Sequence, residues 1–179
     1  MHRYSRYIKG GFMFKKLLCV IIVITVGVFG FFFIRDNIGV SAQKLEADAR
    51  KSQRINEEWL VVKSCSDKIA AMIFYPESLD EHTFSVYAKE TGLSYGYFFK
   101  AGGGIFMDDH VVGFSFNGAY AYLSMNKINI SKIEVVYRER TDIIEIDSEK
   151  PFAFVLPDGA IKANFYDANG KTAEVKMGW

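Results

Sequence analysis

The chain has 179 residues, with 22 Lys and Arg against 21 Asp and Glu, and its formal net charge is +1. The charge is unevenly distributed, because residues 64–179 contain 11 basic and 16 acidic side chains. This acidic excess argues against nucleic acid as a partner, since phosphate contacts need clustered Lys and Arg.

A basic tail and a long apolar segment open the chain. Residues 1–16 contain five Lys and Arg and no acidic residue, and residues 17–34 contain no charged residue. A helix rises about 1.5 Å per residue, so the apolar segment reaches roughly 27 Å of a ~30 Å hydrocarbon core. We expect a single-pass anchor in the lipid bilayer of the cell membrane, with residues 1–16 in the cytoplasm and the C-terminal part outside.

Two alternatives to this N-terminal prediction stay open. Residues 40–42 (Val-Ser-Ala) have the small-residue pattern of a signal-peptide cleavage site, which would remove the anchor after Ala42. Signal-peptide apolar regions are typically shorter, which favours the retained anchor. Translation could also start at Met13 in place of Met1.

Residues 35–63 are predicted to be a juxtamembrane linker with a helix over 41–60. Ser41 can cap this helix, and the following residues are mostly good helix formers. A narrow stripe recurs at alternating spacings of four and three, formed by Leu45, Ala49, Ser52, Ile55 and Trp59. It favours packing on the adjacent domain or a solvated stalk, with a partner helix as the alternative.

Residues 64–179 are predicted to form one extracytoplasmic β-rich domain. Apolar and polar residues alternate in several short runs rich in aromatic and β-branched side chains, near residues 84–88, 95–99, 112–116, 133–137, 152–156 and 161–165. Pro157-Asp158-Gly159 and Asn169-Gly170 indicate turns, and we expect 161–166 and 172–176 to be arms of a final hairpin. The fold class is therefore mainly β, an antiparallel β-sandwich or a small β-barrel preceded by a transmembrane and a short juxtamembrane helix.

The most reactive-looking segment is Asp108-Asp109-His110, with His82 as a further histidine. Two carboxylates and an imidazole could bind a metal or perform acid–base chemistry. Adjacent strand residues point to opposite faces, however, so a polar turn is the favoured interpretation. We therefore assign no catalytic residue, metal or cofactor, and keep Asp108, Asp109, His110 and His82 as candidate metal ligands only.

An aromatic concentration gives a second candidate site, a binding face formed by Tyr95, Tyr97, Phe99, Tyr120 and Tyr122. Aromatic side chains beyond the needs of a core often anchor interfaces, although core packing is the alternative. Cys65 lies alone in the exported part, so an internal disulfide there is excluded and pairing between two chains stays possible.

Taken together, these patterns predict a membrane-anchored binding or accessory module of the cell envelope, whose ligand is an envelope protein or a surface ligand. One alternative is an exported hydrolase or metal-dependent enzyme that uses Asp108, Asp109 and His110. Another is a structural homo-oligomer held by the anchor and the 41–60 helix.

Overall fold

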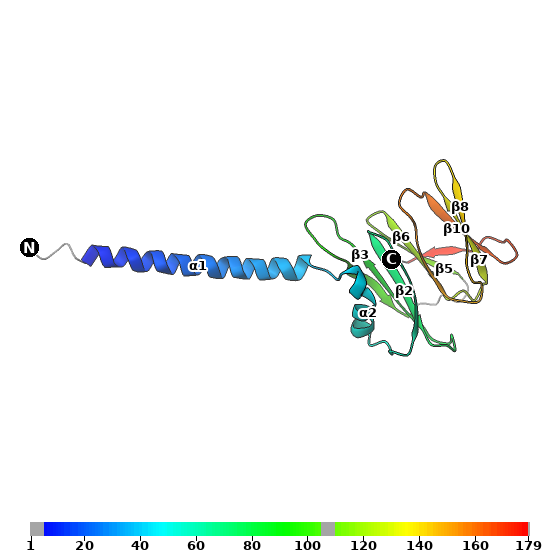
Figure 1. The fold of residues 1–179 in the computed structure, drawn as a ribbon, viewed down its shortest axis with the longest axis horizontal. Helices are drawn as coiled ribbons and strands as arrows, with labels where there is room; N and C mark the ends of the chain where they lie inside the picture. Colours follow the sequence, from blue (N-terminus) through cyan, green and yellow to red (C-terminus); the bar gives the residue numbers. More distant parts are fainter. Residues whose placement is uncertain (1–5, 105–109, 179) are drawn as a thin grey trace, which may run out of the picture. The chain divides into compact units, whose positions relative to one another are not determined.

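The computed structural model describes residues 6–104 and 110–178, and for residues 6–14, 35 and 36 it describes the backbone only. The chain divides into two compact units, Met1–Ile38 and Gly39–Trp179. The first unit contains one helix, α1 (Arg6–Asn37), drawn in blue in Figure 1. Its segment Lys15–Ile34 is long and apolar enough to cross a membrane, and none of it is buried. The predicted N-terminal apolar helix is thus confirmed.

The second unit begins with a short helical segment and continues as three β-sheets. The helical segment is a 3-10 turn, η1 (Ala42–Lys44), followed by α2 (Leu45–Gln53). Sheet I is antiparallel, with the order β1 (Leu60–Cys65), β2 (Ile69–Tyr75), β3 (Thr83–Ala88), β4 (Phe98–Gly103). Sheet II has the order β11 (Val175–Met177), β5 (Val111–Phe116), β6 (Ala119–Ser124), β9 (Phe152–Val155). Sheet III has the order β10 (Lys162–Asp167), β7 (Ile130–Val136), β8 (Thr141–Glu145).

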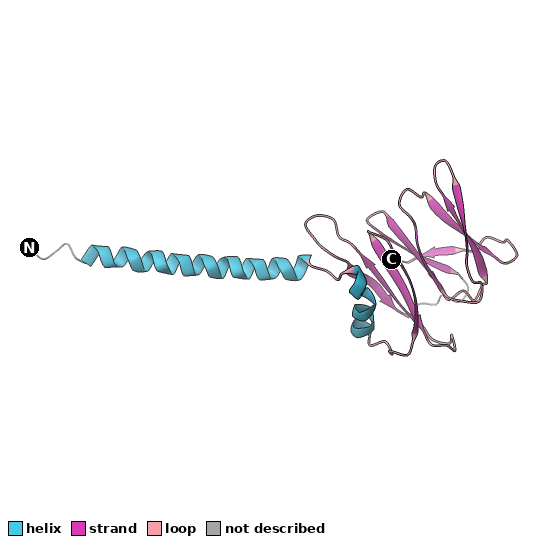
Figure 2. Ribbon diagram, viewed as in Figure 1, coloured by secondary structure: helices cyan, strands magenta, loops and turns pink. Residues whose placement is uncertain are grey.

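Three apolar clusters hold these layers together. Sheets I and II share the first, in which Val86 of β3 and Phe114 of β5 are fully buried. Sheets II and III share the second, around Phe165 of β10. The third lies between α2 and the outer face of sheet I, around Phe74. The unit is therefore a sandwich extended by a third sheet, as the magenta strands of Figure 2 indicate, and the mainly β prediction is confirmed.

The predicted helix over 41–60 ends earlier than expected, at Gln53. Arg54 adopts a left-handed conformation (φ 56°), and the backbone N–H of Ile55 donates to the carbonyl of Arg50. The Arg50 guanidinium donates to the carbonyls of Asn56 and Trp59, both at 2.9 Å. These bonds stabilise a turn, which overrides the helix propensity of the residues beyond it.

The stripe expected on this helix packs on its own domain. Leu45, Ala49 and Ile55 are buried in the cluster against sheet I, and Trp59 packs against that cluster from its edge. Ser52 is exposed. Packing of α2 on the domain, one of the two favoured alternatives, is thus what the structure shows.

The predicted final hairpin is wrong beyond its turn. The arms meet at a single antiparallel bridge, between Tyr166 and Thr172. The chain then crosses to sheet II, where β11 pairs in parallel with β5. Val175 of β11 is half-buried there and packs against the cluster between sheets II and III. The turn at Asn169-Gly170 therefore forms, but the chain after it pairs with a different strand from the one that the turn pattern indicates.

Candidate functional site

Gly39 and Val40, at the start of the second unit, form a backbone junction with residues 95–97, just before β4. Gly39 N–H donates to the carbonyl of Tyr95 at 2.6 Å, and Val40 and Tyr97 exchange both backbone hydrogen bonds at 2.8 Å. A side chain could not fit here, because a Cβ atom on Gly96 would lie 2.8 Å from the carbonyl carbon of Gly39. The two glycines therefore permit the close backbone contact that fixes residues 95–97 to the chain leaving α1.

The five aromatic residues of the expected binding face do not lie together. Tyr97 is buried in the cluster beneath α2, and Tyr122 is buried between sheets II and III. Tyr95 and Phe99 are exposed near β4, with exposed fractions of 67% and 50%, and Tyr120 is exposed on β6. Of these five residues, only Tyr95 and Phe99 are both exposed and close to one another in the sequence. The prediction of a binding face is therefore kept for these two residues alone.

Tyr97 has a structural role that the sequence did not reveal. Its hydroxyl donates to the carbonyl of Ser66 at 2.5 Å and lies 3.5 Å from the exposed Sγ of Cys65. Burial raises the pKa of this phenol well above its ordinary value, with the adjacent thiol adding to the shift. The neutral hydroxyl thus ties the junction to the end of β1.

The residues proposed for metal or acid–base chemistry are only partly described. Asp108 and Asp109 lie outside the described residues, so their part of the hypothesis stays a prediction. His110 is 8% exposed at the start of β5, and its carbonyl accepts a hydrogen bond from Ser124 Oγ. His82 is half-buried just before β3. Within residues 6–104 and 110–178, no three His, Cys, Asp or Glu side chains are grouped so that they could hold a metal ion.

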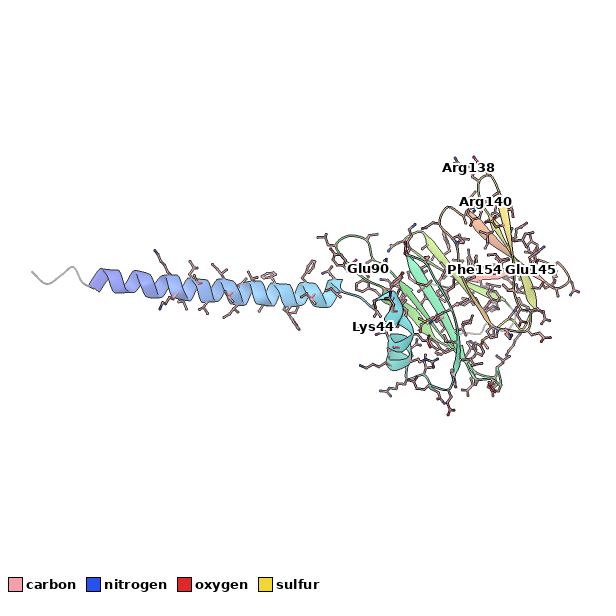
Figure 3. All side chains as sticks on the ribbon, viewed as in Figure 1. Lys44, Glu90, Arg138, Arg140, Glu145 and Phe154 are labelled. Atoms are coloured by element: carbon pink, nitrogen blue, oxygen red, sulfur yellow. The ribbon has the colours of Figure 1, made fainter. Side chains whose placement is uncertain are left out.

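β8 is the most exposed strand of the domain. It is the outer strand of sheet III, with β7 as its neighbour in the described part of the chain. Ile143 and Ile144 have exposed fractions of 60% and 37%. In Figure 3, Arg138 and Arg140 lie at the tip of the β7–β8 hairpin, and Glu145 lies farther along β8. The sequence signal was weak, since Thr141–Glu145 contains only two apolar residues.

The hydrogen bonds on either side of β8 show which backbone groups face outward. Tyr137 N–H donates to the carbonyl of Arg140 at 2.8 Å, and Ile146 N–H donates to that of Ser131 at 2.9 Å. In an antiparallel ladder, hydrogen-bonded pairs recur at every second residue. Residues 142 and 144 therefore bond to β7, whereas the N–H and C=O of residues 141, 143 and 145 point to the open edge.

The face of sheet III beside Ile143 carries an ordered row of polar side chains. Glu134, directly opposite Ile143, accepts hydrogen bonds from Asn164 at 2.9 Å and from the hydroxyl of Tyr166 at 2.8 Å. The hydrogen bond from Asn164 contributes most to lowering the pKa of Glu134, and the bond from Tyr166 lowers it further. Lys132 Nζ lies 4.5 Å from the centre of the Tyr166 ring. The row is mutually bonded, which leaves Ile143 as the exposed apolar group on this face.

The acidic residues within and just after β8 are partly paired with basic ones. Asp142 lies 3.3 Å from Arg140, and Asp147 lies 2.8 Å from Lys150. The hydrogen bond from Lys150, together with the N–H of Glu149, lowers the pKa of Asp147. This segment is therefore a mixed-charge surface, and its chemistry does not resemble a cation site.

Comparisons with protein-family models, with curated proteins and with solved structures gave no significant match to this chain.

Proposed function

We propose that the protein is a single-pass membrane protein whose β domain, outside the cytoplasm, binds an envelope protein by pairing with β8. The supporting observation is the exposed edge of β8, where the backbone groups of residues 141, 143 and 145 face outward around Ile143. An edge of this kind is a template for an added strand from another polypeptide. The bound segment would be extended, with an apolar side chain beside Ile143.

The anchoring part of the proposal rests on α1. The segment Lys15–Ile34 is uncharged beyond its first two residues, and none of it is buried. The basic residues before it favour a cytoplasmic N-terminus by the positive-inside rule. With that orientation the unit Gly39–Trp179 lies outside the cytoplasm.

The charges around β8 favour a polar rim on the partner. Arg138 and Arg140 lie at one end of the strand and Glu145 lies at the other. The edge is therefore basic at one end and acidic at the other. Complementary charges at the two ends of a partner strand would determine its register and orientation. The two isoleucines between them would supply the apolar contact.

Proline substitution can test pairing at β8 without removing the strand. Ile143→Pro deletes an N–H that points to the open edge and leaves the bonds of residues 142 and 144 to β7 intact. Ile143→Val keeps the donor and most of the apolar surface, and it serves as the matched control.

The experiment is affinity purification of the tagged full-length protein and both variants from crosslinked membranes of its own host. The proposal predicts one partner that the native protein and Ile143→Val retain and Ile143→Pro loses. Equal capture by all three proteins would contradict pairing at β8. Capture of no partner by any of them would favour the enzyme alternative, and metal analysis of the purified protein would then follow.

A further inference from the structure

Residues 91–96 form an exposed turn that is bonded to the segment leaving α1. The carbonyl of Tyr95 accepts the N–H of Gly39 at 2.6 Å, and Tyr97 pairs with Val40. We propose that the tip of this turn, at Leu93 and Tyr95, inserts into the phospholipid headgroup layer. The inference rests on the proposed anchoring of α1, and it gives the domain a second contact with the membrane.

Chain length keeps this turn close to the bilayer. From Ile34, the last residue of the apolar segment, α1 continues to Asn37, and two further residues reach Gly39. Three helical residues add about 4.5 Å and two extended residues add about 7 Å, so Gly39 lies within roughly 12 Å of the hydrocarbon boundary. The headgroup layer occupies about 5–8 Å of that distance. Leu93 lies only two residues from Tyr95, so it can reach back into the layer.

The side chains at the tip are those that a headgroup layer accommodates. Leu93 and Tyr95 have exposed fractions of 74% and 67%, whereas Tyr97, two residues further, is 4% exposed. Tyr is enriched at membrane–water interfaces because its ring is apolar and its hydroxyl is polar. Transfer of an exposed leucine side chain out of water is favourable, because it removes apolar surface from contact with water.

The charge pattern also favours lipid. Residues 91–99 contain no charged side chain, which is unusual for an exposed segment of an acidic domain. The nearest acidic group before them, Glu90, is paired with Lys100 at 2.6 Å. Insertion of the tip would therefore bury no unpaired charge.

The close backbone contact between residues 39 and 96 holds this turn in place. Gly39 and Gly96 approach so closely that a Cβ atom on either would clash with backbone. The junction thus holds the tip at a defined position relative to residues 39–40, which follow the anchor. Ordering of the turn in advance lowers the entropy lost when it inserts.

Depth-dependent fluorescence quenching tests the proposal on the full-length chain. In a Cys19→Ser, Cys65→Ser background, Leu93→Cys carries an environment-sensitive dye. Ile143→Cys carries the same dye as a control with comparable exposure in sheet III. Both proteins are reconstituted in phosphatidylcholine–phosphatidylglycerol vesicles that contain nitroxide-labelled lipid, and flotation measures their association with the vesicles.

The proposal predicts several-fold stronger lipid quenching at position 93 than at position 143. Equal quenching in protein that floats with the vesicles would overturn the lipid contact and leave the anchor intact. A dye at position 93 that is shielded from aqueous iodide but not quenched by lipid would also overturn it, in favour of a protein contact. Protein that does not float would overturn the anchor and the lipid contact together.

Discussion

Val40 and Tyr97 exchange both of their backbone hydrogen bonds, each 2.8 Å long, only three residues after the end of α1. The chain thus enters the β domain almost as soon as it leaves the apolar helix. A flexible tether would let the domain reach far from a membrane. This junction instead leaves only a short connection between α1 and the domain, and the lipid contact proposed above depends on that short connection.

Substitution of Gly96 tests the junction. Gly96 and Gly92 both have left-handed φ angles, 87° and 99°, but only Gly96 lies against another backbone segment. Gly92→Ala should lower the free energy of unfolding by about 1 kcal/mol from backbone strain alone. Gly96→Ala should lower it by about 3 kcal/mol, because the added Cβ also separates residues 39 and 96. Urea unfolding in detergent micelles measures both values, and equal losses would contradict the structural role of the junction.

Asn126 stabilises the turn before β7. Its side chain is buried and bonds to the N–H and C=O of Ile130, at 2.7 and 3.0 Å, and to the carbonyl of Asp147 at 3.0 Å. Asn126→Ala should lower the free energy of unfolding by about 2–4 kcal/mol, since buried backbone groups lose their partners. Asn117 has a φ of 50°, similar to the 58° of Asn126, but its side chain is exposed. Asn117→Ala should therefore lower the free energy of unfolding by only about 1 kcal/mol. Comparable losses would show that the buried bonds contribute little.

Tyr87 should make the fold sensitive to high pH. Its hydroxyl donates to Asp48 Oδ2 at 2.7 Å, and burial, followed by that hydrogen bond, raises its pKa well above 10.0. The unfolded chain therefore ionises first, and stability is lost as pH rises above about 10. Tyr87→Phe should lower the free energy of unfolding by about 1–2 kcal/mol at neutral pH. It should also reduce the loss of stability at alkaline pH. Denaturant titrations across the alkaline range measure this, and an unchanged pH dependence would contradict the assignment.

Chemical labelling of Cys65 tests on which side of the membrane the domain lies. Its side chain is exposed at the end of β1, whereas Cys19 lies within the apolar segment of α1. A membrane-impermeant maleimide should label intact cells through Cys65, and Cys65→Ser should abolish that labelling. Labelling that requires disrupted cells would instead place the domain in the cytoplasm.

Several strands were predictable because each has one apolar face directed to a core. β7 is an example: Ile133 and Val135 are buried in the cluster between sheets II and III, whereas Lys132 and Glu134 on the opposite face are only partly buried. β2 lacks this alternation because both of its faces are buried, one against sheet II and the other beneath α2. Its sequence is a continuous apolar run, which periodicity alone does not assign.

The candidate site was harder to predict than the fold. Tyr95 and Tyr97 are two residues apart and chemically alike, yet one is exposed and the other is buried. Their difference arises from long-range contacts with Val40 and Ser66, which no local pattern encodes. The exposed edge at β8 likewise follows from the order of strands in sheet III.

Site-specific photo-crosslinking tests the proposed pairing of β8 with another polypeptide. A photo-crosslinking amino acid is placed at position 143 of the full-length protein in membranes of its own host, with position 115, an exposed residue of β5, as the control. If β8 binds a partner, position 143 should give a discrete adduct with a partner polypeptide and position 115 should give none. Adducts from position 115 alone, or from neither position, would contradict it.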